Sequence, residues 1–404
     1  MTDRLDDRIH SGTPEFRHTN LALFAAGFAT FALLYCVQPL MPEFAREFDV
    51  SPAVSSLALS LTTMLLAVAM LFVGSVSEAW GRKPIMVASL AAAALLTVVS
   101  ALVRQWHAFL VLRTLEGVAF AGLPAIMMAY VGEEIHPGSV GLAMGLYIGG
   151  NGLGGMLGRL LTGLLTDLVS WRFAIGTIGV LGIVASVIVL RSLPPSRHFE
   201  AQPLQSRALM SSFVEHLCDA RLVGLFAEGF LLMGSFVTTY NYISYRLLAP
   251  PYALSQSAVG LIFVVYLVGI FSSAWIGSLA GRLGRWRMLV VTLALMLAGV
   301  LLTAMRPLGA IVLGIAVLTF GFFGAHSVAS SLVGLRARHA KAQASSLYLF
   351  FYYVGSSVAG AVGGFFWSSD GWSGVVRFVS AMVVVGLAVA AALWRYDRTT
   401  CVTA

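Results

Sequence analysis

Apolar runs of about twenty residues, separated by short polar stretches, recur along the whole chain. About 20 apolar residues cross the hydrocarbon core of a bilayer as an α-helix, which satisfies its backbone hydrogen bonds internally. The runs do not alternate apolar and polar residues, as the strands of a membrane barrel would. The pattern therefore predicts an all-α membrane protein with twelve transmembrane helices, at residues 19–41, 53–77, 84–103, 107–131, 138–165, 172–191, 221–247, 256–280, 287–305, 309–334, 342–368 and 372–394.

A polar, proline-containing stretch interrupts this rhythm after the sixth run and predicts a tether between two six-helix bundles. The two halves also share a repeated motif: GSVSEAWGRKP at 74–84 has a weaker copy, GSLAGRLGRWR, at 277–287. Parallel repeats of this kind are typical of alternating-access transporters. We divide the chain into a cytosolic N-terminal tail (1–18), an N-terminal bundle (19–191), a cytosolic linker (192–220), a C-terminal bundle (221–394) and a cytosolic C-terminal tail (395–404).

Composition supports lipid as the surrounding medium. Of the 404 residues, 58% are hydrophobic and only 11% are charged, whereas soluble chains carry roughly 25% charged residues. The mean hydropathy is +0.87. The net charge of +7 lies in short basic runs between apolar segments, which favours membrane topology over nucleic-acid binding. Cys36, Cys218 and Cys401 show no metal-ligand or disulfide spacing.

Basic residues fall mainly on one side of this arrangement. With both termini in the cytosol, seventeen of the 25 Lys and Arg residues lie in cytosolic tails and loops, six lie opposite, and Arg113 and Arg159 lie inside helices. Cytosolic loops of membrane proteins carry such an excess. The first apolar run is also too long for a signal-peptide core. We therefore expect a multi-pass protein with both termini in the cytosol.

Three motifs carry a family resemblance: GSVSEAWGRKP after the second helix, RTLEGVAFAG in the fourth, and GGNGLGGMLGRLLTG in the fifth. Over residues 19–394 the chain resembles the major facilitator superfamily. The stretches FALLYCVQPLMPEFAREFDVSPA (31–53) and FAEGFLLMGSFVTTYNYISYR (226–246) resemble a bacterial subgroup of inner-membrane exporters of drug- or sugar-efflux type. The resemblance implies two pseudo-symmetric six-helix bundles in a bacterial inner membrane. Two departures are Glu78, where the family usually has Asp, and Asn151, where its antiporter signature has Pro.

The loop after the second helix places one acid among basic residues. Glu78 lies at the C-terminal end of its helix, where the macrodipole disfavours an anion, so we expect it to bind a cation. The candidates are Arg82, four residues on, and Arg336, Arg338 and Lys341 before the eleventh helix. The resemblance implies an ion-pair latch between the cytosolic faces, and the alternative is a solvated loop without a gating role. The expected gating loop comprises Gly74, Glu78, Gly81, Arg82 and Lys83.

Ionisable side chains inside the expected helices are candidates for proton coupling, because a charge at mid-membrane costs roughly 2.5–3.5 kcal/mol and needs a partner or a cavity. Arg113 and Glu116 have the spacing of a local pair. The resemblance implies that such an arginine tunes proton release from an acid, and the alternative is a structural pair. Glu228 either titrates in the cavity or reaches the surface. His326 is either a proton relay or a hydrogen-bonded structural residue.

Polar and aromatic residues at helical spacing are candidates for lining a substrate cavity. Ser235 and Thr239 continue from Glu228 along one face of the seventh helix, and we expect this polar stripe to face the cavity. Arg159 is a candidate for binding an anionic substrate or pairing with Asp167. The remaining candidates are Tyr35, Gln38, Tyr348 and Tyr352. Small residues permit close helix packing in lipid, and we expect this role for Gly150, Gly154 and Gly155.

The sequence shows no Walker-type phosphate loop, metal-ligand spacing or nucleophile elbow. We therefore expect no enzymatic activity and no cofactor, with a proton gradient as the energy source. The resulting hypothesis is a monomeric secondary transporter that exports a small amphipathic or sugar-like solute in exchange for protons. The alternative is an uptake symporter or facilitator, and an intramembrane enzyme or sensor is less favoured. The expected partners are the lipid bilayer, a small-molecule substrate and protons, and not nucleic acid.

Overall fold

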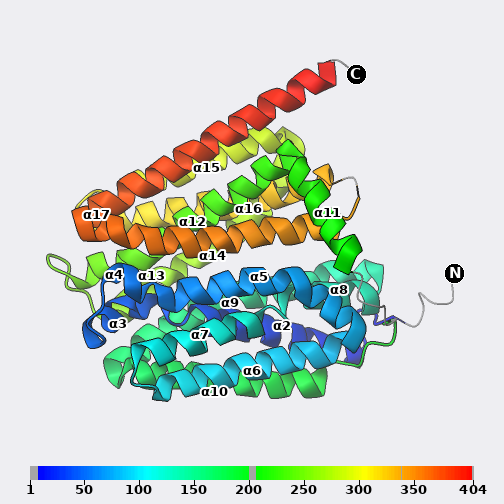
Figure 1. The fold of residues 1–404 in the computed structure, drawn as a ribbon, viewed down its shortest axis with the longest axis horizontal. Helices are drawn as coiled ribbons and strands as arrows, with labels where there is room; N and C mark the ends of the chain where they lie inside the picture. Colours follow the sequence, from blue (N-terminus) through cyan, green and yellow to red (C-terminus); the bar gives the residue numbers. More distant parts are fainter. Residues whose placement is uncertain (1–7, 200–205, 338, 403–404) are drawn as a thin grey trace. The chain divides into compact units, whose positions relative to one another are not determined.

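The protein divides by its internal contacts into two compact units, which are described separately. Unit 1 comprises Met1–Leu40 and Leu65–Ser206, and unit 2 comprises Met41–Met64 and Arg207–Ala404. The structure is a computed structural model that describes residues 8–199, 206–337 and 339–402, which are almost entirely helical. Figure 1 shows the helices of each unit packed side by side. The predicted all-α fold is confirmed.

Unit 1 is built from the helices of the first half of the chain. They are α2 (Pro14–Tyr35), the 3₁₀ helix η1 (Gln38–Leu40), most of α5 (Leu57–Trp80), α6 (Arg82–Leu102), α7 (Trp106–Phe120), α8 (Pro124–Glu134), α9 (Pro137–Leu168) and α10 (Trp171–Ser192). The fourth predicted helix is interrupted at residues 121–123, and Pro124 begins α8. Proline fits there because the first N–H groups of a helix have no partner within it.

Unit 2 is built mainly from the second half. Its elements are α3 (Met41–Glu47), α4 (Pro52–Ser55), the first residues of α5, nearly all of α11 (Ser206–Cys218), α12 (Ala220–Leu248), α13 (Gln256–Ile262), the 3₁₀ helix η2 (Phe263–Val265), α14 (Tyr266–Leu283), α15 (Arg285–Leu302), α16 (Leu308–Arg336) and α17 (Lys341–Val402). The backbone of α17 is non-helical at Asp370 and Gly371. This bend separates the eleventh and twelfth predicted helices.

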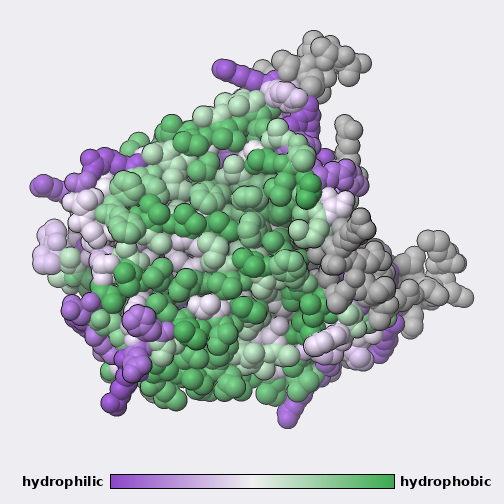
Figure 2. All heavy atoms as spheres, viewed as in Figure 1, coloured by the Kyte–Doolittle hydropathy of each residue, from purple (hydrophilic) through white to green (hydrophobic). Residues whose placement is uncertain are grey.

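All twelve predicted membrane helices have a counterpart in the described residues. Ten helical segments there are long and apolar enough to cross a membrane. The number is lower than twelve because α17 counts once and because neither α7 nor α8 reaches the required length alone. Figure 2 shows apolar residues over most of the visible helical surface. Exposed residues such as Leu102 (75% exposed) and Phe365 (67%) fit contact with lipid rather than with water.

The predicted repeat appears at the same turn of both units. Gly81, between α5 and α6, and Gly284, between α14 and α15, both have a φ of 96°, which side-chain-bearing residues rarely adopt. Close helix contacts repeat as well. A Cβ on Gly154 of α9 would collide with the Phe28 backbone in α2, and one on Gly355 of α17 would collide with the Phe230 backbone in α12. Each unit therefore contains a pair of helices packed backbone to backbone.

Residues 41–64 group with unit 2, whereas the predicted domain boundaries place them in the N-terminal bundle. Tyr245 Oη of α12 donates to the Met41 carbonyl at 2.8 Å, and Ser357 Oγ of α17 donates to the Ser60 carbonyl at 2.7 Å. Apolar periodicity identifies which residues of a helix are buried but not which helix buries them. The compact units and the predicted bundles consequently differ at this segment.

The linker contacts the neighbouring unit at both of its described ends, and its role as a tether stays a prediction. On unit 1, Lys83 Nζ donates to the Leu193 carbonyl, and Tyr130 Oη donates to the Pro194 carbonyl at 3.0 Å. On unit 2, the linker contains helix α11, and His216 Nε2 lies 3.2 Å from the Ala340 carbonyl oxygen. The linker thus follows the surface of each unit.

Candidate functional site

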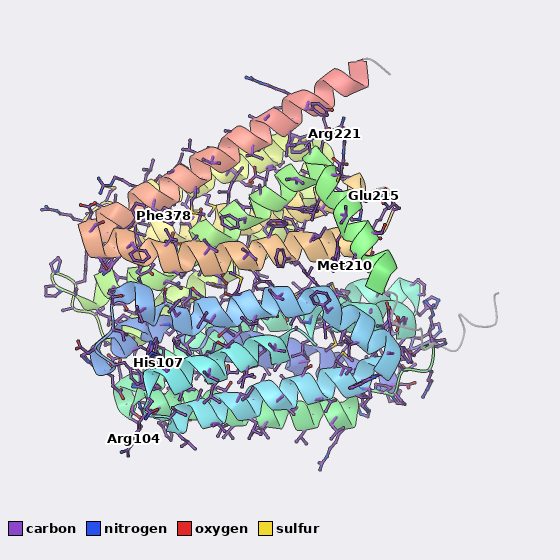
Figure 3. All side chains as sticks on the ribbon, viewed as in Figure 1. Arg104, His107, Met210, Glu215, Arg221 and Phe378 are labelled. Atoms are coloured by element: carbon purple, nitrogen blue, oxygen red, sulfur yellow. The ribbon has the colours of Figure 1, made fainter. Side chains whose placement is uncertain are left out.

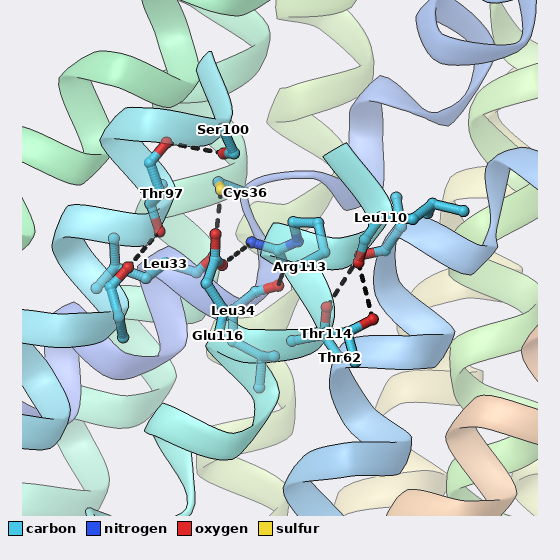
Figure 4. Close-up of polar contacts among 12 residues, drawn as sticks. Leu33, Leu34, Cys36, Thr62, Thr97, Ser100, Leu110, Arg113, Thr114 and Glu116 are labelled. Atoms are coloured by element: carbon cyan, nitrogen blue, oxygen red, sulfur yellow. Dashed lines mark hydrogen bonds and ion pairs between the residues drawn. The ribbon is translucent and has the colours of Figure 1, made fainter. Parts of the chain in front are cut away.

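A fully buried ion pair lies inside unit 1 (Figure 4). The side chains of Arg113 and Glu116 are 0% exposed and form the pair expected from their spacing on α7. Arg113 Nη2 also donates to the Leu34 carbonyl at 3.0 Å. Leu34 lies in the last turn of α2, where carbonyls lack partners within the helix. The pair is confirmed, and its role in proton coupling stays a prediction.

Arg159 of α9 binds the turn between α2 and η1. Its Nε donates to Gln38 Oε1 at 2.7 Å, its Nη1 donates to the Gly155 carbonyl, and its guanidinium carbon lies 4.3 Å from the centre of the Tyr35 ring. Arg159 is 1% exposed. Arg159, Gln38 and Tyr35 are separate candidates in the sequence, and the structure brings them together as one Arg159 cluster. A guanidinium over an aromatic face is stabilised by the negative charge of the ring face.

An aromatic cluster lies inside unit 2. His326 Nδ1 of α16 lies 2.8 Å from Tyr348 Oη of α17, and the His326 ring centre lies 4.7 Å from that of Tyr352. Phe322, one turn before His326, stacks on Phe236 of α12 with 3.9 Å between ring centres. We use "aromatic cluster" for these five residues. The sequence indicates the histidine and both tyrosines as candidates but not the phenylalanines, because a stack between distant helices leaves no local signal.

Glu228 of α12 is 0% exposed, and neither of its carboxylate oxygens has a hydrogen-bond partner within the described part of the chain. A Cβ on Gly386 of α17 would lie 3.2 Å from Glu228 Oε2, so the absent side chain leaves room for the carboxyl group. The adjacent Gly229 lies against the Tyr348 ring. Glu228 therefore lies beside the aromatic cluster, in the interior of unit 2, and the expectation that it reaches the surface is wrong.

The residues of the polar stripe expected on α12 are buried in unit 2. Every residue from 232 to 244 is buried, so burial does not mark one side of this helix as a cavity side. Thr239 Oγ1 donates to the Ser235 carbonyl of the same helix at 2.9 Å, and Tyr242 Oη donates to the Gly360 carbonyl at 2.7 Å. The helical spacing of these polar residues does not show which neighbours they contact, and their role in lining a cavity stays a prediction.

The gating loop makes a different ion pair from the expected one. Arg82 donates to both carboxylate oxygens of Glu133 in α8, through Nη2 at 2.7 Å and Nε at 3.2 Å, and its Nη1 donates to Ser77 Oγ at 2.6 Å. Glu78 is exposed. Arg82 therefore pairs with Glu133 instead of Glu78, through two N–H groups of its guanidinium on one carboxylate. Two neighbouring acids, Glu133 and Glu134, end α8 in the sequence, and this was the overlooked signal.

The remaining latch candidates and gating-loop residues lie at separate places in the structure. Arg336 pairs with Asp397 at 3.1 Å, within unit 2. Arg338 lies outside the described residues. Lys83 donates to the linker, and Gly81 makes the turn, while a Cβ on Gly74 would meet nothing within 4 Å. The latch between the cytosolic faces stays a prediction.

Two of the three expected packing glycines contact another helix backbone. A Cβ on Gly150 would collide with the Phe24 backbone of α2, just as one on Gly154 would with Phe28. A Cβ on Gly155 would instead meet the Arg159 side chain, and Gly158 continues the row against Ala32. The row has a spacing of four residues, which places Gly155 on an adjacent face.

Comparisons with known proteins agree with this architecture. Residues 23–360 match the family model described as Major Facilitator Superfamily. The chain is 56% identical over 379 residues to "Uncharacterized MFS-type transporter YybF" of Bacillus subtilis, covering 94% of both chains. It is 48% identical over 387 residues to "Inner membrane transport protein YnfM" of Escherichia coli, covering 96% of this chain and 93% of the relative.

Solved structures show the same fold at low sequence identity. A bacterial homologue of the human lysosomal transporter Spinster, inward-facing and occupied, has a TM-score of 0.76 at 14% identity and covers 96% of this chain and 98% of its own. The nucleoside transporter NupG has a TM-score of 0.77 at 17% identity and covers 93% and 99%. The curated relatives are named as transporters, not enzymes. The chain belongs to the major facilitator superfamily and is an integral membrane transporter.

Proposed function

We propose that the protein is a proton-coupled transporter that exports a small amphipathic or sugar-like solute by alternating access, acting as a monomer in a bacterial inner membrane with both termini cytosolic. The observation that carries the coupling is Glu228, a buried carboxyl group without a hydrogen-bond partner in the described residues. An unpaired carboxylate inside a bundle is costly, and binding a proton removes that cost.

The two buried carboxyl groups have different surroundings. Glu116 is held by Arg113, which neutralises it without a proton. Glu228 has no such cation and lies next to the His326–Tyr348 hydrogen bond through Gly229. We assign the transported proton to Glu228 and a positioning role to Arg113 and Glu116. Proton binding at Glu228 would change the packing between α12 and α17, the pair that also holds residues 41–64.

The aromatic cluster supports an amphipathic solute. Tyr352 and His326 are partly exposed, whereas Phe236 and Phe322 form a buried stack behind them. Flat aromatic faces bind flat or apolar groups of a ligand by stacking, worth about 0.5–1.5 kcal/mol beyond burial. The imidazole and phenol groups add polar contacts that fix the orientation of the solute.

Transport in proteoliposomes with an imposed pH gradient tests this function. We use ethidium as an amphipathic aromatic probe and compare the wild type with Glu228→Gln, Glu116→Gln and, as control, Glu215→Gln. Glu215 is an exposed carboxylate of α11 with a side chain 61% exposed. We expect gradient-driven ethidium movement to be lost in Glu228→Gln and retained in the control. Movement of ethidium opposite to the proton flux supports export, and movement with the protons supports the uptake alternative.

A readout without substrate separates proton binding from substrate choice. Infrared difference spectra across a pH titration report the carbonyl band of a protonated carboxyl group. We expect a band that disappears in Glu228→Gln and persists in Glu215→Gln. An unchanged spectrum in Glu228→Gln would show that the proton is carried elsewhere.

A further inference from the structure

A cavity of about 120 Å³ lies among α12, α15, α16 and α17 of unit 2. Four leucines form its apolar wall, and Arg221, Arg336, Trp286 and Asp397 form its polar wall. Figure 3 labels Arg221 at the start of α12, beside the end of α11. At about 30 Å³ per water molecule, the cavity has room for a group of several heavy atoms. We call it the arginine pocket.

The pocket contains more hydrogen-bond donors than its own acceptor can use. Arg336 Nη1 lies 3.1 Å and Arg221 Nη1 lies 3.7 Å from Asp397 Oδ1, and Trp286 Nε1 donates to Asp397 Oδ2 at 3.0 Å. Two guanidinium groups carry ten N–H donors, whereas one carboxylate accepts about four hydrogen bonds. The two arginine side chains are 24% and 27% exposed, so a ligand can reach them. One positive charge is in excess, which fits an anion rich in acceptors.

The apolar wall of the pocket indicates which class of anion fits it. Leu335, which lines the pocket, is 61% exposed, so the apolar wall continues onto the outer surface of the unit. Arg336 is the last residue of α16 and Trp286 the second of α15, as expected for side chains at a membrane–water boundary. A phosphate on the arginines with hydrocarbon on the leucines matches the chemistry of a phospholipid. Basic pockets between transmembrane helices bind anionic head groups in this way.

We infer that the arginine pocket binds the phosphate of an anionic phospholipid from the leaflet that faces the linker and the C-terminal tail. That this leaflet is the cytosolic one rests on the orientation in the proposed function, whereas the binding itself does not. Asp397 competes with the phosphate for the same guanidinium groups. Removing Arg221 and Arg336 should therefore weaken lipid binding, and removing the Asp397 charge should strengthen it.

Native mass spectrometry of the full-length protein in detergent, titrated with phosphatidylglycerol, measures this binding without any transport. We expect the double variant Arg221→Gln/Arg336→Gln to bind at least about tenfold more weakly, and Asp397→Asn to bind several-fold more tightly. Arg285→Gln is the matched control, because Arg285 is exposed beside Trp286 but does not line the pocket. It should bind like the wild type, and so should every variant titrated with zwitterionic phosphatidylcholine.

Opposite changes in the two variants separate a binding site from a structural ion-pair network. Equal binding of phosphatidylglycerol by wild type and the arginine double variant would overturn the inference, as would weaker binding by Asp397→Asn. Displacement of the lipid by inorganic phosphate at equal concentration would show that the pocket takes free phosphate, and would overturn the lipid assignment. Circular dichroism establishes that each variant is folded. Loss of transport in Glu228→Gln has no bearing on these titrations, so the two proposals fail separately.

Discussion

At the scale of single residues, the buried charges fall into two groups that the sequence did not distinguish. Arg113 and Arg159 donate hydrogen bonds to groups at the end of α2 and the turn after it, to the Leu34 carbonyl and Gln38 Oε1 respectively. Glu228 has no hydrogen-bond partner in the described residues. A buried side chain whose polar atoms all have hydrogen-bond partners stabilises the fold. A buried carboxyl group without such partners can change its protonation without breaking a hydrogen bond. Under the proposed function, proton coupling therefore depends on which buried charges are left unpaired.

The Arg113–Glu116 pair gives a first prediction. Arg113→Leu leaves Glu116 buried without its cation, and we expect the free energy of unfolding to fall by about 3–5 kcal/mol. In Arg113→Leu/Glu116→Leu both charges are gone, so most of that loss should be recovered. Thermal unfolding in detergent measures both. A single variant that is more stable than the double variant would contradict a structural ion pair.

The His326–Tyr348 hydrogen bond gives a second prediction. Tyr348→Phe keeps the ring but removes the hydroxyl group at 2.8 Å from His326 Nδ1, and should cost about 1–3 kcal/mol. Tyr353→Phe is the matched control, because Tyr353 is a buried tyrosine of the same helix and is not the hydrogen-bond partner of His326. Chemical unfolding compares the two. Equal losses would mean that the bond contributes nothing.

At the scale of elements, glycine positions decide how closely the helices approach. In α9, Gly154 has no room for a side chain, whereas a Cβ on Gly145 would meet nothing within 4 Å. One helix therefore contains both a contact glycine and a free glycine. Helix propensity alone does not separate them, because both are equally unfavourable in an isolated helix.

This contrast gives a third prediction, with opposite signs in one helix. Gly154→Ala forces α9 away from α2, and we expect a loss of about 1–3 kcal/mol. Gly145→Ala has free space and should gain up to about 1 kcal/mol from helix propensity. Melting temperatures in the same detergent provide the comparison. Stabilisation by both alanines would show that the two helices do not touch at Gly154.

The repeated turn gives a fourth prediction. Gly81→Ala places a side chain where φ is 96°, which should cost about 1–3 kcal/mol and displace the gating loop. Gly74→Ala, in the helical part of the same motif, has open space and should be neutral or slightly stabilising. Limited proteolysis of the loop reports its displacement. Identical cleavage in wild type and Gly81→Ala would rule out a conformational role for this glycine.

At the scale of the whole molecule, the packing of residues 41–64 matters most. Thr63 Oγ1 lies 2.7 Å from Ser357 Oγ, and the Ser357 hydroxyl also binds the Ser60 carbonyl. Under alternating access, this end of α5 must separate from α17 once in each cycle for the binding site to open there. The contact between α5 and α17 here is made by small side chains that bear hydroxyl groups. It is close, but few apolar groups have to separate when it opens.

A cross-link across this contact gives a fifth prediction. In a variant with the native cysteines replaced by Ser, Thr63→Cys/Ser357→Cys should form a disulfide on oxidation and stop transport. Reduction should restore it, because the bond is the sole change. The single-cysteine variants under the same oxidant are the control. Wild-type transport rates in the cross-linked protein would show that the contact stays closed throughout the cycle.

The sequence by itself determined the all-α membrane fold, the twelve helices, the repeat and the local Arg113–Glu116 pair. These features depend on the length of each apolar run and on the spacing of residues within one helix. Both can be determined from consecutive residues of the sequence. Only the tertiary structure decided that Arg82 binds Glu133, that Glu228 is buried beside Gly386 of α17, and that residues 41–64 belong with unit 2. These features depend on which helices, distant in the sequence, pack together. The sequence of a helix indicates which of its residues are buried but not which other helix buries them.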